Sequence, residues 1–169
     1  MVLEATKEQL IRYGNIIYES FENDVKKPIL HLKEIIYRNY ILKEPVLQEE
    51  FAFKFEEFKI ISDEFILRSE RWFKFILDSA ILEKKSYENP EKVPVKEILD
   101  CLEDMSNILI HIAYNVAYNV DKKKRKEFEQ LTYHIENLRH SIINFDDGLS
   151  NISKQRKEYI ERINKYIKK

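Results

Sequence analysis

One face of a predicted helix over residues 94–119 carries side chains that could bind a metal ion. Steps of three and four residues place on this face Asp100, Asp104, Asn107, His111, Tyr114 and Tyr118. Carboxylates and an imidazole on successive turns are metal ligands, and the set that we would assign is Asp100, Glu103, Asp104 and His111. Carboxylates from another helix would have to complete the coordination of the metal ion. The opposite face is apolar, so we favour the interpretation that this polar face is the solvent-exposed side of a surface helix.

The four histidines do not show the spacing of known metal or catalytic motifs. A di-iron bundle needs Glu-x-x-His on facing helices, but the third residue before each histidine is Pro28, Ile108, Leu131 or Asn137. The zinc-protease pattern His-Glu-x-x-His and the hydrolase elbow Gly-x-Ser-x-Gly are also missing. The single Cys101 lies at the edge of an apolar face, which is typical of a core residue. We therefore predict no catalytic residue, no cofactor and no enzymatic activity.

Basic residues are concentrated in the last part of the chain. Residues 1–121 hold 16 Lys+Arg against 23 Asp+Glu, a net charge of −7, whereas residues 122–169 hold 13 against 7, a net charge of +6. The cations that could contact a phosphate backbone are Lys122, Lys123, Lys124, Arg125, Lys126, Arg156, Lys157, Arg162 and Lys165. The same charges could instead pair with the acidic part of the chain inside one bundle.

Composition limits the fold and the compartment further. Two glycines among 169 residues leave few positions for the positive backbone angles that hairpins and phosphate-binding loops require. One cysteine excludes a disulfide framework and multi-cysteine zinc sites, which favours a reducing compartment. The sequence shows neither a signal peptide nor an apolar stretch of about 20 residues, so we predict a cytoplasmic protein without membrane insertion.

The apolar period predicts helices along nearly the whole chain. We expect them over residues 6–43, 45–85, 94–119 and 122–145, with a last helix capped by Ser150 after a stop at Asp146-Asp147-Gly148. Pro28 should kink the first helix or divide it near Asp24. The fold class is all-α, an elongated five- or six-helix bundle in a single domain over residues 1–169. Two packed three-helix sub-bundles, divided at loop 86–94, are the alternative arrangement.

The predicted helix over residues 45–85 has two apolar rows, and a break at Ser62-Asp63 is an alternative to one long helix. The first row holds Phe51, Phe55, Phe58, Phe65, Trp72 and Ile76, and the second, at multiples of seven residues, holds Phe53, Ile60, Leu67 and Ile81. A helix that is apolar on two faces should be central. Residues 51–55 also alternate as a strand would, but no second strand can pair with them, so we predict a helix.

Two segments resemble PhoU-type phosphate-transport regulators. Residues 95–116 are similar to a helix of that family with the pattern Glu-x-x-x-Asp, which here reads Glu103 to Asn107. Residues 58–70 contain Asp63-Glu64 in place of a second acidic pair, with Lys59 where the family has a carboxylate. The resemblance implies a regulator built from two three-helix repeats, and the carboxylates lost at these positions argue against the metal cluster of the family.

The function that these features favour is a non-enzymatic helical bundle that acts through protein–protein contacts, as a regulator or a small assembly subunit. Its partner would be another protein or a second copy of the chain. The 20 Phe and Tyr residues supply large amphipathic surface for such contacts, although a role in the core is the interpretation that we favour for most of them. The alternative is a helical subunit of a larger complex that binds a nucleic-acid backbone through the basic last third.

Overall fold

The computed structural model describes residues 2–38, 50–82, 92–115 and 122–167. Over these ranges the chain is helical apart from residues 92–94. The elements are α1 (Val2–Phe21), the π turn η1 (Glu22–Lys26), α2 (Lys27–Ile36), α3 (Glu50–Leu82), α4 (Val95–Asn115) and α5 (Lys122–Ile167). The all-α class is therefore confirmed, and residues 51–55 are helical as predicted.

A π turn keeps α1 and α2 in one continuous rod despite Pro28. Proline has no amide hydrogen, so a regular helix would lose the bond to the carbonyl four residues earlier. Here the Lys27 N–H donates to the Glu22 carbonyl, five residues back, and Pro28 falls in the first turn of α2, where a donor is not needed. Of the two predicted alternatives, the single distorted helix is the one observed.

The described residues form four helices, counting that rod as one, so the predicted count of five or six is wrong. The error lies at Asp146-Asp147-Gly148, where a stop was predicted but α5 continues. The apolar period does not break there, because the buried residues follow one another at steps of three and four: Ile142, Phe145, Leu149 and Ile152. At 1.5 Å per residue the 46 residues of α5 span about 69 Å. Two three-helix sub-bundles do not occur in the described part of the chain.

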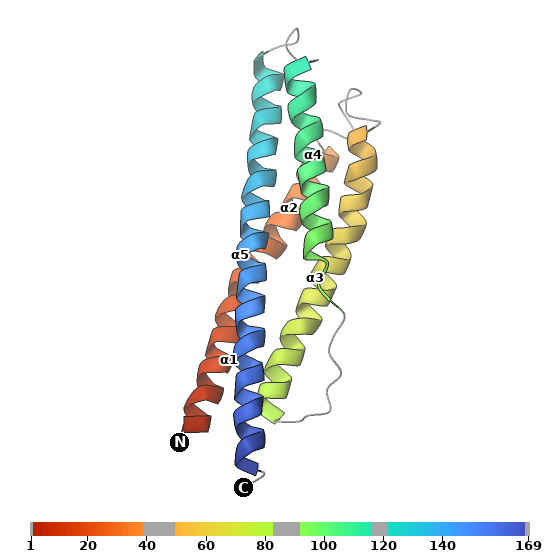
Figure 1. The fold of residues 1–169 in the computed structure, drawn as a ribbon. Coiled ribbons are helices and arrows are strands. Elements are labelled where there is room, and N and C mark those ends of the chain that lie inside the picture. Colours follow the sequence, from red (N-terminus) through yellow and green to blue (C-terminus); the bar gives the residue numbers. More distant parts are fainter. Residues whose placement is uncertain (1, 39–49, 83–91, 116–121, 168–169) are drawn as a thin grey trace.

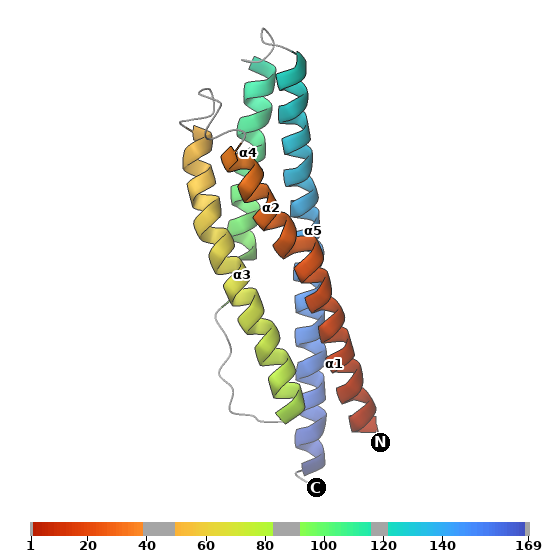
Figure 2. The ribbon, with the colours of Figure 1, turned by 180° about the vertical axis from the view of Figure 1, so that it is seen from behind.

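α5 runs the length of the bundle, and the other helices pack around it (Figures 1 and 2). α1 lies along the C-terminal half of α5, α4 lies along its N-terminal half, and α3 packs against both α1 and α4. α1 begins and α5 ends at the same end of the molecule. An aromatic cluster joins three helices near the middle, with ring centroids 4.9 to 6.3 Å apart, and consists of Phe21, Phe65, Phe73 and Phe145.

α3 lies at one edge of the bundle in both views rather than at its centre (Figures 1 and 2). The phenylalanines of its first apolar row are buried, and Trp72 is half-buried. In the second row, the exposed fractions are 63% for Phe53, 67% for Ile60 and 43% for Leu67. The prediction of a central helix is therefore wrong, because only one of the two rows faces other elements. Ile76 and Ile81 lie outside the side chains that the structure describes.

No break occurs at Ser62-Asp63, and α3 continues through it. The Ser62 hydroxyl donates to the Lys59 carbonyl at 3.0 Å, so this buried polar group is satisfied inside the helix. The predicted helix over residues 94–119 is present as α4 over Val95–Asn115, and residues 116–119 lie outside the described residues. Most of the predicted loop 86–94 lies outside the described residues.

Candidate functional site

Two of the three acidic residues predicted as metal ligands on α4 contact cations of neighbouring helices. The Lys54 ammonium of α3 lies 3.1 Å from Asp104, and Arg139 of α5 lies 3.9 Å from Glu103. Asp100 and His111 are exposed. Among the described residues, no three His, Cys, Asp or Glu side chains are grouped so that they could hold a metal ion. These carboxylates serve ion pairs on a largely solvated face, which is the interpretation favoured from the sequence.

Cys101 is buried between α4 and α3. Its thiol donates to the Lys54 carbonyl at 3.5 Å. Burial, with a smaller contribution from the charge of Glu57, raises the pKa of the Cys101 thiol to about 11. A thiol with that pKa is almost entirely protonated at neutral pH, and the thiolate is the nucleophile. The prediction of a core residue is confirmed.

The two basic clusters predicted from the sequence are held apart by the unbroken α5. About 32 residues of helix lie between Lys124 and Arg156, which corresponds to about 48 Å. The cations of the second cluster, Lys157, Arg162 and Lys165, are exposed, and Arg156 places its guanidinium 4.4 Å from the centre of the Phe75 ring. Lys126 is exposed, while the side chains at residues 122–125 lie outside the described part. The clusters therefore do not form one continuous surface.

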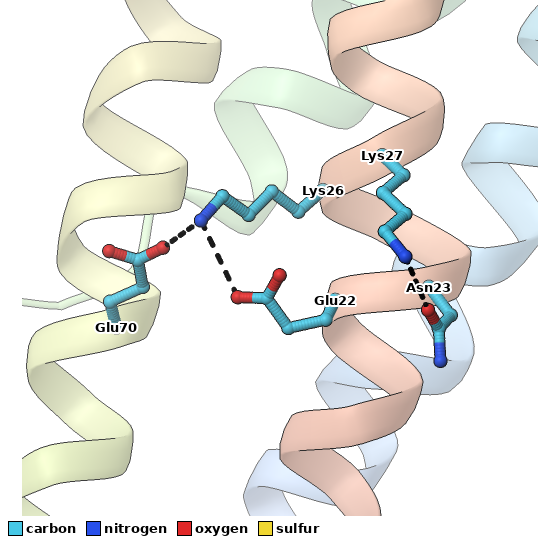
Figure 3. A network of polar contacts seen from close by, with 5 residues as sticks. All are labelled: Glu22, Asn23, Lys26, Lys27 and Glu70. Carbon is cyan, nitrogen blue, oxygen red and sulfur yellow. Dashed lines mark hydrogen bonds and ion pairs between the residues drawn. The ribbon is translucent and has the colours of Figure 1, made fainter.

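The π turn fixes the rod to α3 through a lysine. The Lys26 ammonium donates to Glu70 of α3 at 2.7 Å and contacts Glu22 at 3.4 Å (Figure 3). The bond to Glu70 is the main reason why the pKa of Lys26 is raised. Lys27 points away from α3 and donates to Asn23 at 3.1 Å (Figure 3). No pattern in the sequence predicts this contact between α3 and the rod.

Two grooves contain polar groups that the sequence does not bring together. One has a volume of about 410 Å³, and its lining includes His31 of α2 and His134 of α5, with Asp24 and Asn137. Ser20 already donates to Asp24 at 3.0 Å. The other has a volume of about 540 Å³ and is lined by residues that include Trp72, Lys92, Lys96, Asp100 and Asp146. Burial raises the pKa of Asp146. Neither groove pairs a base with a nucleophile among its described lining residues.

The most unusual surface is the outward side of α3. We call Phe53, Ile60 and Leu67 the α3 row; they repeat every seven residues and lie opposite the buried Phe55, Phe58 and Phe65. Scattered exposed apolar residues are normal on a protein surface. Three large ones in line along about 21 Å of one helix form an apolar strip, which is interrupted by Glu56, Asp63 and Glu64. The sequence analysis identified the row but assigned it to the interior.

Acidic side chains surround the middle of the α3 row, and basic side chains follow its end. Glu56 and Glu64 are one turn before and one turn after Ile60, and Asp63 lies between them. These carboxylates each contact a cation, since Lys59 bonds Glu56 at 3.0 Å, Arg68 bonds Glu64 at 3.1 Å and Lys33 bonds Asp63 at 2.7 Å. Arg71 and Lys74, both exposed, come four and seven residues after Leu67.

An apolar groove between α2 and α3 adjoins this strip. It has a volume of about 290 Å³ and includes Leu30, Tyr37 and Phe55 in its lining. Leu30 and Tyr37 are half exposed, although they are large apolar and aromatic side chains. Two further large side chains are thus exposed on α2, and the charged residues Lys59 and Asp63 line the α3 side of the groove.

Comparisons with protein-family models, with curated proteins and with solved structures found no match for the chain. The resemblance to PhoU-type regulators stays a prediction. None of the helices that the structure describes combines the length and the apolar character needed to cross a membrane.

Proposed function

We propose that this protein is a non-enzymatic helical bundle that acts through protein–protein contacts, as a regulator or a small assembly subunit, and that the α3 row is its contact surface. The observation that carries the proposal is the exposure of Phe53, Ile60 and Leu67 in one line. Covering a side chain of this size contributes about 1.5–3 kcal/mol when the burial is complete. A partner that covers all three would therefore gain several kcal/mol before the costs of association.

The spacing of the row suits a helix as the partner element. Large apolar side chains repeated every seven residues lie along one side of α3, and a partner helix laid beside α3 would contact all three of them. The adjoining groove at Leu30 and Tyr37 would extend the contact beyond one row. The described part of the chain supplies no catalytic arrangement that would compete with this interpretation.

The proposal is tested by site-specific photo-crosslinking in host cells. A benzophenone amino acid replaces Phe53 in one variant and Ile16 in a control, since Ile16 is 57% exposed on α1 and lies outside the row. We expect a protein adduct from position 53 and none, or much less, from position 16. Equal adducts from both positions, or none from position 53 in a folded protein, would contradict the proposal.

A second function, binding of a nucleic-acid backbone, is favoured by the exposure of Lys157, Arg162 and Lys165 near the end of α5. Each phosphate neutralised by a protein cation contributes a slope of about −0.9 to the dependence of log affinity on log salt for duplex DNA. Fluorescence anisotropy with labelled RNA and duplex DNA should then show binding that weakens with salt and is lost in K157E/R162E/K165E. Flat titrations at low salt would eliminate this function for those ligands.

A further inference from the structure

We infer that the groove at the start of α4 binds a small zwitterion, an α-amino acid with a large apolar side chain. We call this groove, which has a volume of about 540 Å³, the α4 groove. It lies where α4 begins beside the middle of α5, while α3 and α5 continue past that point (Figures 1 and 2). Its volume is within the range of about 300–1,000 Å³ that is typical of small-molecule sites. The inference goes beyond the proposed function, because it adds a small ligand and uses no residue of the α3 row.

Three helices and the turn before α4 supply the apolar part of the lining. Trp72 of α3 and Leu99 of α4 are half-buried, and Leu149 of α5 is buried. Val93 and Val95 complete this part where the turn leads into α4. A large apolar side chain placed here loses contact with water and packs against an indole ring.

The polar part of the lining contains a cation and a carboxylate that do not pair. Lys92 belongs to the turn before α4, and the half-buried Asp146 belongs to α5. Neither side chain forms a hydrogen bond or an ion pair with another described residue. The two charges still act on each other, because burial and the charge of Asp147 raise the pKa of Asp146 and the Lys92 ammonium opposes this rise. Opposite charges thus line one groove without meeting.

This arrangement favours a ligand that carries both charges. A ligand with only a negative charge would meet three carboxylates in the lining, those of Glu97, Asp100 and Asp146. A ligand with only a positive charge would meet Lys92 and Lys96. An α-amino acid can place its ammonium at Asp146 and its carboxylate at Lys92, so that both unpaired charges gain an opposite one. Its side chain is then left for the apolar part of the groove.

The elements that carry the two charges are fixed in place. Arg68 of α3 donates from Nη1 to the Lys92 carbonyl at 3.2 Å, which holds the turn before α4 against α3. Asp146 lies in the middle of α5, and Ser150 and Ser153 follow it by one and two turns on the same side. Their hydroxyls can accept from a ligand ammonium or donate to a ligand carboxylate. A bound amino acid would therefore join α3, α4 and α5 at this point.

Matched probes test the class of ligand on the full chain. L-Phenylalanine carries both charges, 2-phenylethylamine lacks the carboxylate and 3-phenylpropanoate lacks the ammonium. Isothermal titration calorimetry should show saturable binding of L-phenylalanine, with each single-charge analogue weaker by about tenfold or more. L-Leucine, with isopentylamine and 4-methylpentanoate, is the aliphatic set. An analogue that binds as tightly as its amino acid would overturn the inference, and so would the absence of saturable binding of both amino acids to the folded protein.

Trp72 reports whether the ligand lies in the α4 groove, because it is the only tryptophan of the chain. The amino acid that binds should change the Trp72 emission, with the dissociation constant that calorimetry gives. Binding that leaves this emission unchanged would place the ligand elsewhere and overturn the inference.

Two variants test the two charges separately, with circular dichroism showing that each is folded. D146N should weaken binding of the amino acid about tenfold without weakening that of its anionic analogue, which has no ammonium for Asp146. K92M should weaken binding of the amino acid about tenfold without weakening that of its cationic analogue. The controls D147N and K154M remove exposed charges outside the lining and should stay within about threefold of the wild type. Affinity of D146N and K92M equal to that of the wild type would overturn the inference.

Discussion

Gly148 of α5 lies directly against Ile17 of α1, with the position of a Gly148 Cβ 3.5 Å from the Ile17 Cδ1. This distance is ordinary van der Waals contact rather than a clash. Gly148 is half-buried in the middle of a helix of 46 residues, and Ile17 is buried in the interface. The two helices thus meet at a point where α5 has no side chain, although a methyl group would fit.

Gly148→Ala should stabilise the protein by about 0.5–1 kcal/mol, because alanine removes the entropic cost of glycine in a helix. Gly148→Leu should destabilise it by about 1–3 kcal/mol, because the larger side chain must displace Ile17. Urea unfolding followed by circular dichroism measures both. Destabilisation by alanine would show that a Cβ atom at Gly148 lies closer to Ile17 than the 3.5 Å of ordinary van der Waals contact.

The same glycine explains why the helix count was predicted incorrectly. Asp146-Asp147-Gly148 is a typical helix stop when only local preferences are considered. The apolar period from Ile142 to Ile152 passes through these residues, and packing against α1 outweighs the cost of glycine, about 1 kcal/mol. Periodicity across the tripeptide was the available signal for one long helix. The π turn at Pro28, in contrast, was predictable in position, because proline always removes a donor.

The residues of the candidate site were predicted from the sequence, but their exposure was not, for a different reason. Both rows of α3 consist of large apolar residues at helical spacing, and this spacing alone does not state whether one row or both meet another helix. That choice depends on where α1, α4 and α5 lie, which is information from the whole chain. The ion pairs between helices, such as Lys26–Glu70 and Lys54–Asp104, depend on the same packing and have no local signature.

The Lys26–Glu70 contact should contribute about 0.5–1 kcal/mol to stability, because the pair is short but both side chains are partly exposed. We expect K26M and E70Q each to lower the free energy of unfolding, and K26M/E70Q to cost less than the sum of the two. A double-mutant cycle by urea unfolding measures this coupling. Additive single effects would show that the 2.7 Å contact contributes nothing in solution.

The coupling between Lys26 and Glu70 should also be lost at alkaline pH. The pKa of Lys26 is raised above its ordinary value of 10.5, chiefly by the bond to Glu70. Its stabilising contribution is therefore complete below the pKa of the unfolded chain and is lost as pH rises through the higher pKa of the folded protein. Tyr18, whose pKa is raised chiefly by its bond to Glu22, titrates in the same direction, so the cycle is best measured in a Y18F background. A coupling that stays constant as pH rises through the alkaline range would contradict this assignment.

Cys101 should react with a thiol reagent about a hundredfold more slowly in the folded protein than in urea. Burial raises its pKa to about 11, so near pH 8 only about one thiol in a thousand is ionised, against roughly one in ten for a thiol at its ordinary value of 9.0. S150C in a C101A background provides the control, because residue 150 is exposed on α5 and should react at the rate of a free thiol. Labelling of folded wild type at the rate of that control would show that Cys101 is accessible and ionised. Cys101 would then be a possible nucleophile, and that result would contradict the proposal of a non-enzymatic bundle at this residue.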